Sequence, residues 1–176
     1  MPFDITQANW GRDASLPGIL QAKQFVMKHV GWTSTSTSYV NTPISGIITP
    51  SSSDSKIIVA VDLMSYGDPG MAIRISRTVT GSASANPVVS DSSANNTAAT
   101  LFAAPYHGSS YHTNNLHYTY VDSPSATTAV TYMIQAYTYQ GTMYLNRTAS
   151  SHAYSTHGTS QITLMELREA TTGLIT

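Results

Sequence analysis

The sequence predicts an all-β chain folded as an antiparallel β-sandwich. Short runs in which apolar and polar residues alternate, rich in β-branched and aromatic side chains, recur along the 176 residues. Clusters of Gly, Pro, Ser and Asp separate these runs, and no segment has a clear helical period. About eight to ten short strands at such spacing are typical of sandwiches and barrels, and two sheets that each need one face covered pack as a sandwich.

The composition narrows the classes of function. The length suits a single domain. Charged residues make up 10% of the chain, against a usual ~25%, and a net charge of -1 attracts no phosphate backbone. Because Cys is absent, no disulfide or Cys-based zinc site is possible. No apolar run approaches the ~20 residues of a membrane span, and the N-terminus lacks the pattern of a secretory signal. We therefore expect neither nucleic-acid binding nor membrane insertion.

Residues 1–18 are expected to form an extended arm. Phe3, Ile5 and Trp10 are spaced among Asp, Asn, Gly and Pro. One interpretation is a poorly ordered terminus, since termini of this composition are mobile unless something holds them. The other is an anchoring arm whose three large apolar side chains are buried in a partner, and this is the interpretation we adopt.

The domain itself is expected over residues 19–168. Residues 19–30 fit a strand and partly fit a helix, and we interpret them as a strand. Residues 56–64 are the most apolar strand, with both faces apparently covered, so Asp62 requires a partner if it is buried. The other strands expected before residue 105 are 44–49, 71–80 and 98–104, with 33–40 open between an edge strand and a loop.

Residues 116–147 predict three successive strands. The alternation of residues 116–121 stops at 122–124, resumes over 130–139 and breaks again at Gln140 and Gly141, before a third run. Because a short break that contains Gly usually joins a hairpin, the segment is expected to be an antiparallel meander. A last strand follows over residues 161–167, and residues 169–176 are a tail.

No motif predicts an enzyme. The sequence contains no G-x-S-x-G, H-E-x-x-H, P-loop or G-x-G-x-x-G pattern. A scattered Ser, His and Asp triad stays open on sequence alone. We expect no catalytic residue, no cofactor and no metal site.

Two predicted loops, 105–115 and 148–159, are rich in Tyr and His. Tyr beside polar residues recognises partners at low entropic cost, which makes these loops candidates for receptor contact. The alternatives are histidines that simply face solvent, or that respond to pH because imidazole titrates near neutrality. The candidate contact residues are Tyr106, His107, Tyr111, His112, Tyr154 and His157.

Three segments, residues 44–63, 120–147 and 160–167, carry a family resemblance. In their order and pattern they resemble virion proteins of bacteriophages, especially aquatic phages, whose globular domain is similar to the C1q/TNF-like trimeric jelly roll. The resemblance covers about residues 20–167. It implies a homotrimer displayed on the particle surface as a fibre tip, a head fibre or a decoration protein. It also implies that the last strand packs at the heart of the domain and near the threefold axis. For a trimer, a further alternative for the loop histidines is a site at which three copies of one His hold a metal.

The resemblance and the strand alternation together suggest a set of packing residues. Those expected in the core or the trimer contact are Tyr118, Tyr120, Ile162, Leu164, Met165 and Leu167. The arm has no heptads and no Gly-X-Y repeat, which favours a short arm docked into another virion protein over a long fibre. The expected function is a non-enzymatic phage virion protein that serves as capsid decoration, as a head fibre or as a tail-fibre tip contacting a host glycan or receptor. The alternative is a C1q-like soluble glycan-binding or adhesion module.

Overall fold

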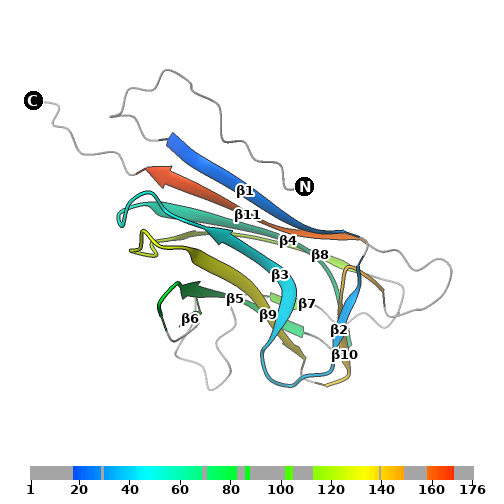
Figure 1. The fold of residues 1–176 in the computed structure, drawn as a ribbon. Coiled ribbons are helices and arrows are strands. Elements are labelled where there is room, and N and C mark those ends of the chain that lie inside the picture. Colours follow the sequence, from blue (N-terminus) through cyan, green and yellow to red (C-terminus); the bar gives the residue numbers. More distant parts are fainter. Residues whose placement is uncertain are drawn as a thin grey trace, which may run out of the picture.

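The computed structural model describes residues 18–28, 30–68, 71–82, 86–87, 102–104, 113–138, 140–148 and 158–168. Within these ranges the regular elements are all strands, and they form two antiparallel sheets packed face to face (Figure 1). The predicted all-β antiparallel sandwich is confirmed. The sequence-predicted residues that lie outside the described ranges are Phe3, Ile5, Trp10, Tyr106, His107, Tyr111, His112, Tyr154 and His157, together with the tail 169–176.

Sheet A has six strands in the described residues: β1 (Gly18–Lys28), β2 (Trp32–Ser34), β4 (Lys56–Asp68), β8 (Asn114–Asp122), β10 (Thr142–Leu145) and β11 (Thr159–Arg168). Its hydrogen-bonded order is β1-β11-β4-β10-β2, and β8 also pairs with β4. Because β8 and β11 pair with overlapping residues of β4, they occupy its opposite edges. The strand β10 pairs with the last residues of β4, beyond the start of β11.

Sheet B has five strands in the described residues: β3 (Val40–Ile48), β5 (Met71–Val79), β6 (Asn86–Pro87), β7 (Phe102–Ala104) and β9 (Val130–Thr138). The strand β9 lies between β3 and β5, while the short strands β6 and β7 pair with the far edge of β5. The strands β1 and β11 of sheet A pack over β3. The edge strand of each sheet, β1 in one and β3 in the other, therefore lies on the same side of the sandwich.

The core forms where the inward-facing residues of the two sheets meet. In β4 and β11 every second side chain is fully or almost fully buried, which is the period that a half-covered strand requires. Burying one large aliphatic side chain stabilises the fold by about 1.5–3 kcal/mol. The cluster consists of Ile44, Ile48, Ile57, Val59, Val61, Leu63, Ile73, Ile75, Val130, Tyr132, Ile134, Ala136, Met143, Leu145, Ile162 and Leu164.

The predicted meander over residues 116–147 is wrong. Its three strands exist, but β8 pairs with β4 in sheet A, β9 lies in sheet B, and β10 is again in sheet A. Both edges of β9 are occupied, by β3 and β5, so β10 has no edge of β9 to pair with. The break at Gln140 and Gly141, where Gly141 has a φ of 74°, is consequently a connection between sheets and not a hairpin turn.

Strand boundaries differ from the prediction mainly at β3. The strand begins at Val40, four positions before the expected start, and its register shifts between Asn41 and Ser45. Pro43 lies in this irregular stretch of an edge strand, a position where Pro is tolerated. The hydroxyl of Thr42 donates to the carbonyl of Ile134 at 2.9 Å and so keeps the strand attached across the shift. Of the ambiguous residues 33–40, the first two belong to β2, the last begins β3, and those between form a connecting loop.

A buried polar cluster ties the two sheets together. Arg77 of β5 donates to Oδ1 of Asp122 at the end of β8 at 2.6 Å, and the hydroxyl of Tyr132 donates to Oδ2 at 2.7 Å. Asp122 and Tyr132 are both buried. Burial, followed by the bond to Asp122, raises the pKa of the Tyr132 hydroxyl far above its ordinary value, so this phenol stays protonated as a donor.

Asn146 joins four strands of sheet A where β10 ends. It is fully buried with a φ of 57°, and its backbone N–H donates to the carbonyl of Met64 at 2.9 Å. Its side-chain amide donates to the carbonyl of Met27 in β1 at 2.8 Å and accepts from the hydroxyl of Ser160 in β11. Asn tolerates this left-handed conformation better than most residues, which explains its use at the junction.

Candidate functional site

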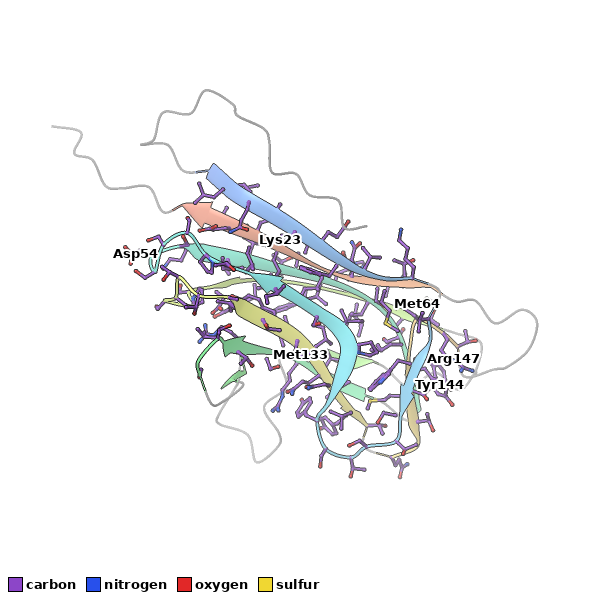
Figure 2. The ribbon with its side chains drawn as sticks, in the orientation of Figure 1. Lys23, Asp54, Met64, Met133, Tyr144 and Arg147 are labelled. Atoms are coloured by element: carbon purple, nitrogen blue, oxygen red, sulfur yellow. The ribbon has the colours of Figure 1, made fainter. Side chains whose placement is uncertain are left out.

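The outer face of sheet A carries an unusual distribution of side chains. The residues of β4 and β11 that point away from the core alternate with the buried ones, and the strand register aligns them in rows across β8, β4, β11 and β1. Figure 2 labels Asp54 near one end of these strands and Met64 near the other. The rows nearest Asp54 are mainly apolar, with Lys56 as their charged member, and those nearest Met64 are mainly polar.

The apolar rows form a continuous surface that we call the apolar patch. One row aligns Val121, Ile58 and Met165, and in the next Leu167 lies between Ile19 and Lys56, so that Lys56 borders the patch. Val121 is 50% exposed and Ile19 is 43% exposed, and the other three side chains are partly exposed. None of the five belongs to the core cluster. Scattered apolar residues are normal on a surface, but a contiguous group of them indicates a contact site.

The polar rows form a hydrogen-bonded chain that we call the polar ladder: His117 of β8, Asp62 of β4, Gln161 of β11 and Gln24 of β1. Nδ1 of His117 lies 2.6 Å from Oδ1 of Asp62, and the amide of Gln161 donates to Oδ2 at 2.7 Å. The amide of Gln24 in turn donates to Gln161 at 3.0 Å. The bonds from Gln161 and then His117 lower the pKa of Asp62, so this carboxylate is charged at neutral pH. The sequence required a partner for Asp62 only if it were buried; its side chain is 41% exposed, and it nevertheless has two hydrogen-bond partners.

The outer face of sheet B is more polar. Arg74 donates to Gln135 at 2.7 Å, and Gln135 donates to Asn41 at 2.7 Å, across β5, β9 and β3. The guanidinium of Arg74 lies 4.0 Å from the ring centre of Tyr39, a cation–π contact. Tyr39 also makes an edge-on contact with Tyr137. Apolar residues do occur on this face, but the centre of its three main strands is polar and hydrogen-bonded.

The structure separates the predicted packing residues into two groups. Ile162 and Leu164 are fully buried in the core, whereas Met165 and Leu167 lie in the apolar patch. Tyr118 and Tyr120 are partly buried and align with the inward-facing Val61 and Val59 of β4. The strand alternation did not predict Ile19, Ile58 or Val121 as surface residues. The signal for Ile58 was present, because both faces of its strand are apolar.

Glu166 holds β11 next to the apolar patch. It is fully buried, and its Oε1 accepts from the backbone N–H and hydroxyl of Ser51 and from the hydroxyl of Ser55, all within 2.6–2.7 Å. Its Oε2 accepts from the amide of Gln21 in β1 at 2.6 Å. Burial alone would raise the pKa of Glu166, but the bonds from Ser51, Ser55 and Gln21 outweigh it and lower the pKa. The carboxylate thus fixes the residue 51–55 turn to the sheet.

The described residues offer no metal centre, since within them no three or more His, Asp or Glu side chains are grouped for metal binding. The same part of the chain has no helix long and apolar enough to cross a membrane.

Comparison with known proteins gives distant structural likenesses and no match in sequence. No protein-family model matches the chain, and no curated protein matches it in sequence. The chain is similar to a chain of the crystal structure of the infectious bursal disease virus VP2 subviral particle, with a TM-score of 0.40 and 10% sequence identity. The likeness covers 96% of this chain but 43% of the VP2 chain, so this chain spans less than half of that length. The sandwich assignment rests on the strand pairing described above.

Proposed function

We propose that this protein is a non-enzymatic structural protein of a phage virion surface, built as a homotrimeric domain of the C1q/TNF-like jelly-roll type. Two points support the proposal: the sequence resemblance of residues 44–63, 120–147 and 160–167, and the two-sheet antiparallel fold. The observation that carries it is the apolar patch on the outer face of a sandwich whose core is already complete.

Water in contact with the apolar patch favours burial of the patch against another copy of the chain. The two sheets bury their own core between them, so the patch contributes nothing to that core. A copy that covers the patch removes the exposed parts of Ile19 and Val121 from water, which stabilises the assembly by about 1 kcal/mol for each side chain. The polar ladder beside the patch remains hydrated and marks one border of the contact. Closed symmetric assembly also hides a surface that would otherwise promote aggregation.

In this proposal the arm attaches the protein to the particle and the loops contact the host. Residues 1–18, with Phe3, Ile5 and Trp10, attach the trimer to the particle through another virion protein, and the Tyr- and His-rich loops contact a host glycan or receptor. A decoration protein or head fibre would be present in many copies per particle, whereas a fibre tip would be present in few and would bind host cells when purified. Counting copies per particle separates these roles. Removing residues 1–18 is expected to leave the trimer intact and to abolish its incorporation into particles.

Light scattering of the purified full chain tests the trimer. We expect a mass about three times the 18.8 kDa of the chain. Met165→Lys places a positive charge inside the patch, next to Lys56 and without an acidic partner, and because an unpaired buried charge costs several kcal/mol, the variant is expected to be monomeric. Thr163→Lys is the matched control, since Thr163 lies on the same face of β11 but in the row beyond the patch. A wild-type chain that is monomeric at all concentrations would refute the proposal.

A glycan-binding or adhesion module is the second candidate, and the outer face of sheet B favours it. Tyr39, Arg74, Gln135 and Asn41 combine an aromatic ring with charged and amide groups. If this face binds glycans, the purified chain will bind an immobilised glycan without any particle, and Gln135→Ala will weaken that binding. Binding that Gln135→Ala leaves unchanged would exclude this face.

A further inference from the structure

In the described strands of sheet B, the outer face carries a single charged side chain, Arg74 of β5. These strands contain no Asp or Glu, and their other charged residue, Arg77, points inward to Asp122. Among the described residues no acidic side chain pairs with Arg74, and its side chain is partly exposed. The positive charge at this position is therefore open to an anionic group from outside the fold.

Two contacts hold the guanidinium of Arg74 in one orientation. Its Nε donates to Oε1 of Gln135 at 2.7 Å, and its plane lies over the ring of Tyr39, 4.0 Å from the ring centre. Neither contact uses the two terminal nitrogens. Because a guanidinium carries its N–H groups in one plane, these nitrogens form a fork that matches a carboxylate through two parallel hydrogen bonds. The fork is already oriented, so a ligand orders little additional side chain when it binds.

The hydrogen bonds beside Arg74 run in one direction. Arg only donates, so Gln135 must turn its carbonyl oxygen toward Arg74 and its amide nitrogen toward Asn41. That nitrogen donates to Oδ1 of Asn41 at 2.7 Å, which leaves the amide nitrogen of the exposed Asn41 as a further donor. The spare hydrogens along this row all belong to N–H groups, and the site therefore fits a ligand that is rich in acceptors.

The arrangement of these donors favours a short saccharide over a compact ion. Arg74, Gln135 and Asn41 align in one row across β5, β9 and β3, and neighbouring strands lie ~4.8 Å apart, so the donors extend over about 10 Å. Figure 2 labels Met133, which lies on the same face of β9 two residues before Gln135. A single inorganic anion needs donors that converge on one point. An acidic peptide or a nucleic acid carries repeated charges, whereas the described part of this face offers one cation.

We propose that Arg74, Gln135 and Asn41 form a binding site for an acidic saccharide, whose carboxylate accepts from the fork of Arg74 and whose neighbouring hydroxyls accept from the two amides. This deepens the second candidate function by naming the class of ligand, and it rests on that candidate in treating this face as a glycan site. It does not depend on the trimer, because the apolar patch lies on the other sheet.

Isothermal titration of the purified full-length chain tests the ligand class. The acidic probes are trigalacturonate and sialyllactose, and their uncharged counterparts are methyl-esterified trigalacturonate and lactose. We expect saturable binding of at least one acidic probe, and at least about tenfold weaker binding of its counterpart and of a penta-glutamate peptide. Failure of both acidic probes to bind at about 10 mM would overturn the proposal, and so would equal binding of an acidic probe and its counterpart or of the peptide.

Variants locate the binding on this face. Arg74→Gln should weaken binding of the acidic probe at least about tenfold, and Arg74→Lys should also weaken it, because a lysine keeps the charge but loses the fork. Arg147→Gln is the matched control: Arg147 also lies over a tyrosine ring, that of Tyr144, but it follows β10 in sheet A, and binding should be unchanged. Equal losses in Arg74→Gln and Arg147→Gln, or wild-type binding by Arg74→Lys, would overturn the proposal.

Two further results separate this inference from the proposals that precede it. Should Arg74→Gln fail to fold, Asn41→Ala at an exposed position replaces it and should weaken binding about threefold, and no loss would count against the site. A neutral saccharide that binds as well to Arg74→Gln as to wild type, while the acidic probes do not bind, would keep the glycan-binding candidate and overturn the acidic site. A monomeric mass in light scattering refutes the trimer and leaves the binding measurement to decide this site.

Discussion

The two faces of β11 differ in what they do for the molecule. The inward face carries Ile162, Leu164 and Glu166, all fully buried. The outward face carries Thr163, Met165 and Leu167, all partly exposed. Both faces contain large apolar side chains, so hydrophobicity alone does not distinguish them. What distinguishes them is coverage, since sheet B packs on one face and no described part of the chain packs on the other.

This comparison predicts that substitutions on the inward face lower the free energy of unfolding, whereas substitutions on the outward face weaken assembly. Leu164→Ala removes a fully buried side chain and is expected to lower the free energy of unfolding by about 2–5 kcal/mol. Met165→Ala is expected to change the unfolding free energy of the monomer by less than about 0.5 kcal/mol but to weaken assembly. Urea unfolding at low protein concentration and light scattering at high concentration measure the two effects. Equal losses of unfolding free energy at both positions would mean that the two faces do not differ.

The contact between the sheets next to β11 provides a second test. A Cβ on Gly46 would lie 2.8 Å from Phe25 and 3.0 Å from Cδ1 of Leu164, so Gly46→Ala forces side chains of the core to shift and should cost about 1–3 kcal/mol. Gly31→Ala is the control, because the atom it would meet belongs to the flexible side chain of Arg147. Thermal unfolding of the two variants should show a clear loss of stability for Gly46→Ala and a smaller one for Gly31→Ala.

Glu166, on the inward face of β11, makes the stability of the fold depend on pH. Its pKa is lowered in the folded state, so its stabilising effect is fully present above its unfolded pKa of about 4.3 and is lost as the pH falls through the lower folded value. Glu166→Gln should cost about 1–3 kcal/mol at neutral pH, because the bonds from Ser51, Ser55 and Gln21 then reach a neutral group. The difference from wild type, measured by urea unfolding across a pH series, should shrink below about pH 4. A difference that is constant from pH 7 to pH 3 would contradict this account.

The smallest effect is expected at the polar ladder. His117 is 70% exposed and Asp62 is 41% exposed, and solvent screens an exposed pair of this kind. His117→Ala should therefore change the free energy of unfolding by less than about 0.5 kcal/mol. Differential scanning calorimetry at two salt concentrations checks this, and a loss as large as that of Gly46→Ala would show that the ladder is part of the structural core.

The sequence alone determined the fold class and most strand positions. Alternation of apolar and polar residues indicates which side chains lie on the same covered face, and this local rule correctly located β4, β9 and β11. It also indicated that β4 is apolar on both faces, and Ile58 of the apolar patch lies on the outward one. Turn residues such as those at 50–55 marked where strands end, because their conformational preferences are local as well.

Only the tertiary structure decided which strands pair and which polar groups meet. The short connection between β9 and β10 predicted a hairpin, yet the two strands lie in different sheets because β3 and β5 occupy both edges of β9. The partners of Glu166 in the residue 51–55 turn lie more than 100 positions away in the sequence. Such pairings depend on competition among all strands for a limited number of edges, and a local pattern contains no information about that competition.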